Sequence, residues 1–163
     1  MQDDKEVVLD AVTQTGLALQ FASEALRGAK EVVLQAVKQN GKSIQYAAAS
    51  LRGDSDVVLE AVQHTGSALQ FASAGLRGHK KVVLAAIKQH GHALAYASQE
   101  LKADKQTVLE AVKRKGSALR FASKALLSNP EVVLQAAQQD ITALIYAAEA
   151  MKSSPDLIKA FVI

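Results

Sequence analysis

Residues 54–78 read DSDVVLEAVQHTGSALQFASAGLRG, and this stretch decides the fold because the rest of the chain repeats it with variations. Its Val-Val-Leu triplet recurs at a constant spacing of 25 residues, with Thr107 replacing the first valine in one copy. Six copies fit, at residues 4–28, 29–53, 54–78, 79–103, 104–128 and 129–153, and a terminal half-repeat follows at 154–163. A fixed period of this size is typical of solenoid proteins.

The first half of each copy carries the signals of an α-helix start. Short polar residues that can cap a helix occupy one column, and the next column contains Pro130 and Pro155, which suit a first helical turn. Acidic residues follow, where they favour the positive end of the helix dipole. The capping column consists of Asp4, Asp54, Asp104, Asn129 and Ser154, while His79 takes the same position in copy four.

Glycines predict where this first helix ends. They stand at positions 16, 41, 66, 91 and 116, where a left-handed conformation would stop the helix. A second helix of similar length is expected from about Leu17 to Arg27, ending at Gly28 and at its counterparts in copies two and three. Copy six has Asp140-Ile141 at the turn, so the pattern does not predict its conformation there.

The apolar columns predict that the copies stack. Val8 and Val12 mark one side of the first helix, while Leu19, Ala22 and Leu26 form an i, i+3, i+7 stripe on the second. Isolated helices of about 11 residues are marginal in water, so a single copy would not fold alone. The sequence therefore predicts an all-α fold, an α-solenoid (superhelix) of two-helix repeats forming a single domain over residues 1–163.

An aromatic column alternates between phenylalanine and tyrosine, which suggests a true unit of about fifty residues. Our interpretation is that each ring packs between neighbouring copies and that the tyrosine hydroxyls reach water or a carbonyl. The alternative is a ladder on which nucleic-acid bases stack. The column consists of Phe21, Tyr46, Phe71, Tyr96, Phe121 and Tyr146.

Two stretches carry a family resemblance: VVLQAVKQNGKSIQYAAASLR at residues 32–52 and VVLAAIKQHGHALAYASQELK at residues 82–102. They resemble the tandem helical repeats known as domain of unknown function 4116, found mainly in bacteria and protists. The resemblance covers roughly residues 3–153. It implies a repeat module in larger, interaction-rich proteins and transfers no activity or catalytic residue.

Composition excludes several classes of protein. The chain has 163 residues, 49% of them hydrophobic, and no cysteine, which rules out disulfides and thiolate metal sites. No apolar run approaches the roughly 18 residues of a membrane span. We expect a soluble protein without a cofactor, in the cytoplasm or elsewhere inside the cell.

Little in the sequence indicates catalysis or metal binding. His90 and His92 flank Gly91, with His64 one copy away, but we expect the two neighbouring side chains to diverge as polar turn residues. Hydrolase, nucleotide-binding and metalloprotease motifs are absent. Carboxylates such as Glu60 and Glu110 are expected on a solvated face, so the chain is predicted not to be an enzyme.

Charge is distributed unevenly. Between Arg77 and Lys124 there are eleven Lys or Arg and three acids, a balance of +8, whereas the rest of the chain sums to −5. Cations in the last turn of a helix are explained by its dipole, but the excess in copies four and five is not. This band would dock an acidic protein or a nucleic-acid backbone. Its candidate contact residues are Lys88, Lys113, Arg114, Lys115, Arg120 and Lys124.

A polar pair before each glycine varies between copies, from Gln14-Thr15 to Arg114-Lys115. Its layout is similar to the variable pair of transcription-activator-like DNA-reading repeats, although the period and flanking sequence differ. Ordinary variation of a loop is the simpler interpretation.

Further candidate contacts come from outward columns and from the C-terminal end. Gln20, Gln45 and Gln70 are expected on the concave side of the superhelix, with the acidic first-helix row on the convex side. Apolar residues stand at exposed columns near the end: Leu127, Ile141, Ile145 and Phe161. The terminal segment would act as a lid, mark the cut end of a longer protein, or form a homodimer.

These patterns favour a non-catalytic scaffold for protein–protein interaction. The alternative is binding of nucleic acid or another polyanion through the basic band from Arg77 to Lys124.

Overall fold

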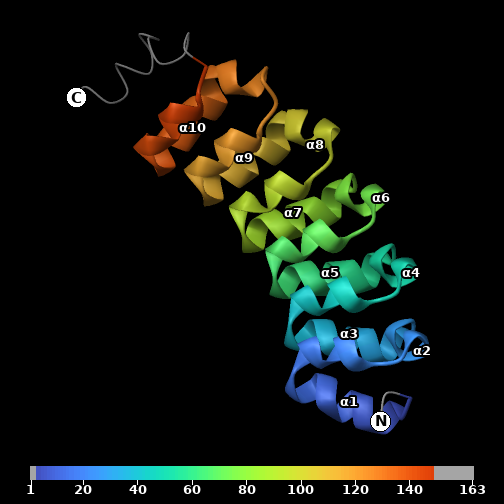
Figure 1. Ribbon diagram of the computed structural model, residues 1–163. Coiled ribbons are helices and arrows are strands. Elements are labelled where there is room, and N and C mark those ends of the chain that lie inside the picture. The colour runs from blue at the N-terminus through green and yellow to red at the C-terminus, as the bar shows by residue number, and fades with distance from the viewer. Residues whose placement is uncertain (1–2, 149–163) are drawn as a thin grey trace.

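The computed structural model describes residues 3–148, which form one elongated, curved stack of helices (Figure 1). Its repeating units follow one another at the 25-residue period, and no strand occurs in the described range. The prediction of an all-α repeat solenoid is therefore confirmed. The predictions made for Ser154, Pro155 and Phe161 concern residues outside the described range.

Each copy begins with an α-helix of ten residues, and these long helices form one row of the stack. Four of these six helices are capped by a side chain of the capping column, whereas α3 has Ala29 at that position and no side-chain cap. The Asp54 carboxylate, for example, accepts hydrogen bonds from the N–H groups of Asp56 and Val57. Pro130 takes the first position of its helix, as predicted. His79 stands at the cap position but makes no capping hydrogen bond through its side chain. The row comprises α1 (Lys5–Gln14), α3 (Lys30–Gln39), α5 (Ser55–His64), α7 (Lys80–Gln89), α9 (Lys105–Arg114) and α10 (Pro130–Gln139).

The prediction of a second α-helix of similar length is wrong. In copy one a 3-10 helix runs over Gly16–Phe21, the chain extends at Ala22 and Ser23, and a short α-helix follows over Glu24–Arg27. A 3-10 helix has three residues per turn, so residues three apart, such as Gly16 and Leu19, share its buried side.

The other copies repeat this second half. The 3-10 helices are η1 (Gly16–Phe21), η2 (Gly41–Tyr46), η3 (Gly66–Phe71), η4 (Gly91–Tyr96), η5 (Gly116–Phe121) and η7 (Ile141–Tyr146). The short elements are α2 (Glu24–Arg27), α4 (Ala49–Arg52), α6 (Ala74–Arg77), α8 (Gln99–Ala103) and η6 (Leu126–Ser128).

The glycines at the turns do not act as predicted, because no residue in the described range has a positive φ. They are required by a close approach between copies instead. A Cβ atom on Gly16 would lie 2.3 Å from the carbonyl oxygen of Ala36 in the next copy. Ala36 and its counterparts in copies three to six are fully buried at the same junctions.

A continuous core runs along the stack between the row of long helices and the row of 3-10 helices. Val57, Val58 and Leu69 are fully buried in copy three, and their counterparts repeat in the copies on either side. Five rings of the aromatic column pack against this core while staying partly exposed, whereas Phe21 is 66% exposed. The aromatic column is therefore largely a packing feature of the stack.

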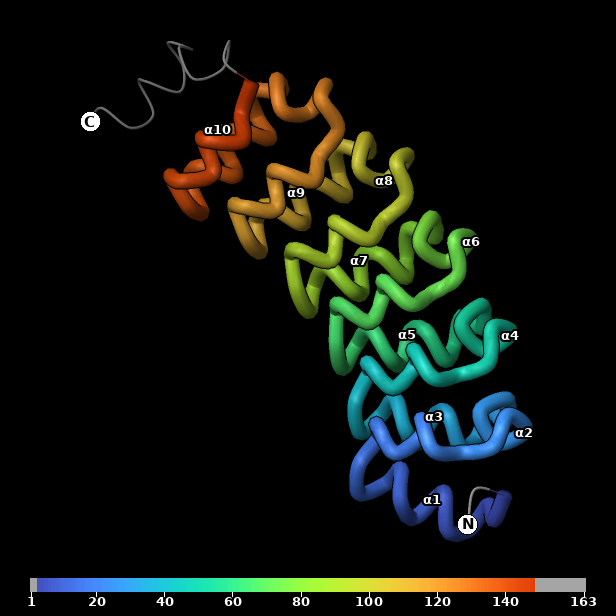
Figure 2. Tube along the Cα trace, in the orientation of Figure 1, coloured from blue at the N-terminus to red at the C-terminus, as the bar shows by residue number. Residues whose placement is uncertain are grey.

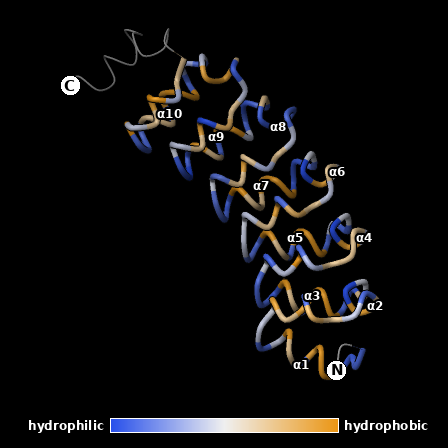
Figure 3. The backbone as a smooth tube through the Cα atoms, viewed as in Figure 1, coloured by the Kyte–Doolittle hydropathy of each residue, from blue (hydrophilic) through white to orange (hydrophobic). Residues whose placement is uncertain are grey.

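Figure 2 traces the chain across the stack along each long helix and back along the 3-10 helix. This path leaves two edges, a turn edge between each long helix and its 3-10 helix, and a short-helix edge formed by α2, α4, α6, α8 and η6. Figure 3 shows that polar residues gather at both edges. In Figure 1 the stack bends toward the turn edge, so the expectation that the 3-10 row forms the concave side is not confirmed.

The polar pair at the turn edge has a structural role in alternate copies. Gly16 donates its N–H to the Gln39 side chain (2.7 Å), and Gly116 donates to Gln139 in the same way. Gln89 donates to the carbonyl oxygen of Gln63 (2.9 Å). A glutamine in copies two, four and six thus contacts the turn of the preceding copy, so these contacts also recur every fifty residues.

The turn of copy six keeps the common backbone although it lacks glycine. The Asp140 side chain accepts a hydrogen bond from the N–H of Thr142 (3.0 Å), as Asn40 does from Lys42. Ile141 starts η7 and is 51% exposed.

Candidate functional site

An ion-pair ladder links successive long helices at their first turns. A lysine at the first residue of one helix reaches an acidic residue at the start of the next. These acids therefore join neighbouring copies as well as meeting the helix dipole. The N–O distances are 2.5 Å for Lys5–Glu31, 3.0 Å for Lys30–Asp56, 2.9 Å for Lys80–Asp104 and 2.5 Å for Lys105–Glu131.

The lysines and carboxylates of the ladder stabilise each other's charged forms. Hydrogen bonds to Asp54 and then to Asp56 raise the pKa of Lys30 above its ordinary value. The bond from Lys30 lowers the pKa of the Asp54 carboxyl. The pKa of Asp104 is lowered first by the Thr107 hydroxyl and then by Lys80. Because the pairs are largely exposed, each adds little to stability, and their main effect is to neutralise charge at the junctions.

The ladder is interrupted at one junction, between α5 and α7. Ser55 stands where α1, α3, α7 and α9 have lysine, and Lys81 stands where the acid would be. Among the described residues no ion pair joins these two helices. The sequence contains this signal in part, since lysine and acid are 26 residues apart at three of the paired junctions and 24 apart at the fourth, and both members of the pair are missing here.

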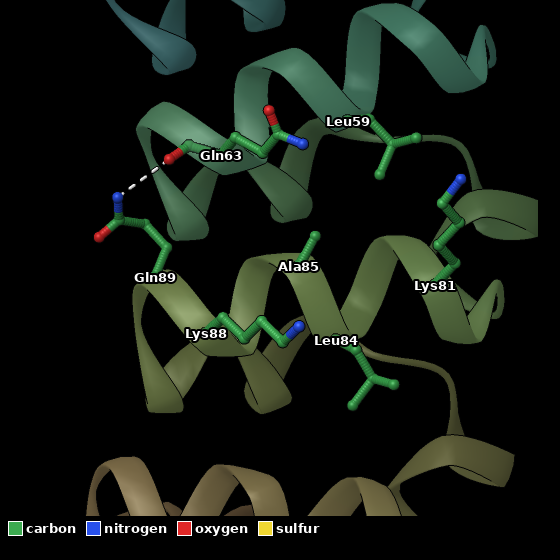
Figure 4. A pocket seen from close by; sticks show the side chains of 7 residues that line it. All are labelled: Leu59, Gln63, Lys81, Leu84, Ala85, Lys88 and Gln89. Carbon is green, nitrogen blue, oxygen red and sulfur yellow. Dashed lines mark hydrogen bonds between the residues drawn. The ribbon is translucent and has the colours of Figure 1, made fainter.

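A groove of about 800 Å³ lies at this junction. Leu59 and Leu84 are half-buried in its lining, and Ala85 stands in a column that elsewhere holds Asp10, Gln35, Glu60, Glu110 and Gln135. Figure 4 shows Lys81 toward one end and the Gln63–Gln89 hydrogen bond at the other, with Leu59 and Ala85 between them. We call this the α5–α7 groove; it offers apolar surface beside the cations of Lys81 and Lys88.

A smaller groove of about 320 Å³ follows between α7 and α9. Leu84 lines both grooves, so the apolar strip continues from one junction to the next. Here the charges are balanced, because Lys80 pairs with Asp104 and Lys113 with Glu110 (3.5 Å). The α5–α7 groove is distinguished by the positive charge that its own helices leave uncompensated.

The basic band does not form a single patch. Lys81, Lys88 and Lys113 lie along the row of long helices. Arg114 and Lys115 stand at the turn edge, and Arg120 lies in η5 with its guanidinium 4.5 Å from the centroid of the Phe121 ring. Arg77 and Lys102 lie in α6 and α8 at the short-helix edge, and Lys124 stands just before η6 of the same edge. Of the residues predicted from the band, only Lys88 lies in the α5–α7 groove, and Lys113 lines the neighbouring one.

The remaining predicted contacts are scattered. Gln20, Gln45 and Gln70 occupy one column of the 3-10 row, and Arg120 and Ile145 share it. Ile145 is 66% exposed, whereas Leu127 packs partly against the core. Phe161 lies outside the described residues, so a homodimer through the C-terminal end stays a prediction. Sequence reasoning missed Leu59, Lys81, Leu84 and Ala85.

The expectation that His90 and His92 diverge is wrong. Their ring centroids are 5.3 Å apart in an edge-to-face arrangement, and His92 meets the Phe121 ring at 5.7 Å in the same way. His92 Nε2 lies 2.8 Å from the Ser117 hydroxyl. These contacts pack copy four against copy five. No group of three or more His, Cys, Asp or Glu side chains that could hold a metal ion occurs in residues 3–148.

His92 is expected to make the stability of the fold depend on pH. Burial lowers the pKa of His92, and the nearby charges of Arg120, His90 and Lys115 lower it further. The unfolded chain then binds a proton more readily than the folded one, so we expect the free energy of unfolding to fall as the pH drops below about 6.5.

Urea unfolding between pH 7.5 and 5 measures the slope of the free energy of unfolding against pH. His92→Ser, which installs the residue of copies three and five, is expected to flatten it. Equal slopes for the wild type and the variant would contradict the assignment.

The fold and its surface define a helical-repeat protein built from stacked α and 3-10 helices. No helix within the described range is long and apolar enough to span a membrane. Five overlapping stretches match the family described as Domain of unknown function (DUF4116), at residues 4–52, 29–77, 54–102, 79–127 and 104–152. Together they cover residues 4–152, and the chain belongs to this family. No curated protein and no solved structure gave a significant match.

Proposed function

We propose that this chain is a non-catalytic scaffold that binds an acidic segment of another protein in the α5–α7 groove. The observation that carries the proposal is the interruption of the ion-pair ladder at this junction, where Ser55 and Lys81 replace a lysine and an acid. An acidic side chain from a partner would complete the missing pair at Lys81.

The lining of the groove supports a protein segment as the occupant. Leu59, Leu84 and Ala85 offer apolar contacts, and Lys81 and Lys88 add positive charge beside them. A ten-residue helix is about 15 Å long, so the groove suits a short segment with apolar anchors flanked by Asp or Glu. Opposite charges across such an interface favour correct encounter and orientation.

The distribution of the basic band is a reason to prefer this partner to nucleic acid. A phosphate backbone is bound by cations that follow one continuous track. Here the cations are divided among the long-helix row, the 3-10 row and both edges, while the α5–α7 groove combines cations with leucines.

Selection from a display library of random 16-residue peptides tests the proposal without assuming a partner. We expect enriched peptides to combine Asp or Glu with large apolar residues. Lys81→Glu with Lys88→Glu should weaken their binding at least about tenfold, equivalent to about 1.4 kcal/mol. Fluorescence anisotropy measures the dissociation constants.

The matched control is Arg114→Glu with Lys124→Glu, which changes the net charge equally at the two edges of the stack. It should alter peptide affinity no more than about threefold, since exposed distant charges are screened. Enriched peptides that bind the groove variant as tightly as the wild type would contradict the proposal. Binding of a DNA duplex that weakens steeply with salt and equally in both variants would favour the polyanion alternative.

A further inference from the structure

A column of arginines stands at the short-helix edge, at the ends of α2, α4 and α6. Arg27, Arg52 and Arg77 are the last residues of these helices. Their carbonyl oxygens accept hydrogen bonds from the N–H groups of Ala48, Ser73 and Ser98 in the following copies, at 2.9, 2.8 and 2.9 Å. The backbone thus fixes the three arginines at equivalent positions.

Each of these arginines has an unmet hydrogen-bond donor. The Nε atoms of Arg27, Arg52 and Arg77 are buried from solvent and have no acceptor among the described residues. None of the ion pairs found in residues 3–148 involves an arginine. A buried donor without an acceptor is unfavourable, and its recurrence in three successive copies makes it a property of the column.

Two of the arginines line one cavity. Arg27 and Arg52 border a volume of about 310 Å³ between copies one and two, together with Gln45 and Tyr46. The small side chains at positions 47–49, all alanine, complete much of the lining. Glu24 is the one acid at its rim.

We propose that this cavity binds an oxyanion, a carboxylate or phosphate group, between Arg27 and Arg52. A guanidinium is always charged and presents its N–H donors in a planar fork that matches two oxygens of such a group. Because Nε is buried from solvent, the guanidinium must turn toward the cavity, and its Nε donor then gains an oxygen of the anion as acceptor. The site lies at the short-helix edge, apart from the α5–α7 groove, and does not depend on the function proposed for that groove.

Variation along the column limits the site to the N-terminal copies. The next two positions are Lys102 and Leu127, and neither can form the arginine fork. Glu24 opposes an anion electrostatically, and its counterparts in copies two and three are Ala49 and Ala74. Each substitution used in the test below therefore introduces a residue that another copy already has in the same column.

The arginine side chains report on binding directly through their Nε–H signals in nitrogen-15 NMR spectra. The chain has five arginines, so Arg114 and Arg120 serve as internal controls. During titration with inorganic phosphate, and separately with glutarate, at constant ionic strength, we expect saturable shifts of the Arg27 and Arg52 signals. Phosphate alone causing saturation would identify phosphoryl groups as ligand, and saturation by both would identify oxyanions generally.

The proposal would be overturned if neither phosphate nor glutarate gave saturable shifts, or if all five arginine signals shifted in parallel. Arg27→Leu, which copies Leu127, should weaken binding at least about tenfold as read from the Arg52 signal, and Glu24→Ala should strengthen it several-fold. Arg27→Lys keeps the charge and removes the fork, so it tests the geometry if the leucine variant does not fold. Unchanged affinity in Arg27→Lys would exclude recognition by the fork.

Discussion

Gly41→Ala is expected to lower the free energy of unfolding by about 3 kcal/mol or more, because a methyl group cannot fit at this junction. A Cβ atom at position 41 would lie 2.2 Å from the carbonyl oxygen of Ala61 and 2.8 Å from Cβ of Thr65. That carbonyl accepts a hydrogen bond from the N–H of Thr65 (2.9 Å) within copy three. Relief of the clash therefore requires copies two and three to separate, which exposes the core that they share.

Urea unfolding followed by circular dichroism measures the loss. Gly75→Ala is the matched control, since a Cβ atom there meets nothing within 4 Å and the residue lies in helix α6. It should leave stability unchanged or raise it by about 0.5–1 kcal/mol. A Gly41→Ala variant within about 0.5 kcal/mol of the wild type would show that the junction is looser than the structure indicates.

Much of the fold could be predicted because its determinants repeat in columns. The capping residues, Pro130 and the buried valines each have a single physical explanation. Because such residues recur at the same position in several copies, their placement is not a matter of chance. Asp4 and Asp54 cap their helices as the sequence predicts. Val57 and Leu69 are buried as the apolar columns predict.

The second half of each copy was predicted less well because a short α-helix and a 3-10 helix place apolar residues at similar spacings. Leu19, Ala22 and Leu26 fit an α-helical stripe, yet the first two also fit the three-residue turn of a 3-10 helix. Ser23, which accepts a hydrogen bond from the N–H of Leu26, was the available sign that a new helix begins there.

The role of the turn glycines could not be found from one copy alone. Glycine is required both by a left-handed backbone and by a close approach, and the sequence does not distinguish the two reasons. The Ala61 carbonyl that excludes a side chain at Gly41 belongs to the next copy, twenty residues away. Only the stacking of copies shows which reason applies.

The candidate surface was predicted in part. The excess of cations in copies four and five is visible in the sequence, but Lys113 lines the groove between α7 and α9, whereas Arg114 and Lys115 stand at the turn edge. The exchange at Ser55 and Lys81 was visible as well. That this exchange interrupts a series of ion pairs could be recognised only from the ion pairs at the other junctions, because an acid in the first turn is also explained by the helix dipole.

Ser55→Lys combined with Lys81→Glu should abolish partner binding by giving the α5–α7 junction the ion pair of its neighbours. Lys30 and Asp56 show the arrangement that the new pair would adopt, with an N–O distance of 3.0 Å. The new glutamate would pair internally and repel an acidic segment. We expect at least about a thirtyfold loss of affinity, equivalent to about 2 kcal/mol.

The same change should leave stability within about 1 kcal/mol of the wild type, because an exposed ion pair contributes little. Lys124→Ala removes the same single unit of positive charge at the short-helix edge, so it controls for net charge. It should bind the selected peptides as the wild type does.

The most direct test is an anisotropy titration of a library-selected peptide against the wild type, Ser55→Lys/Lys81→Glu and Lys124→Ala at one salt concentration. Binding lost in the double variant and kept in Lys124→Ala would support the groove as the partner site. Wild-type affinity in a folded double variant would contradict it.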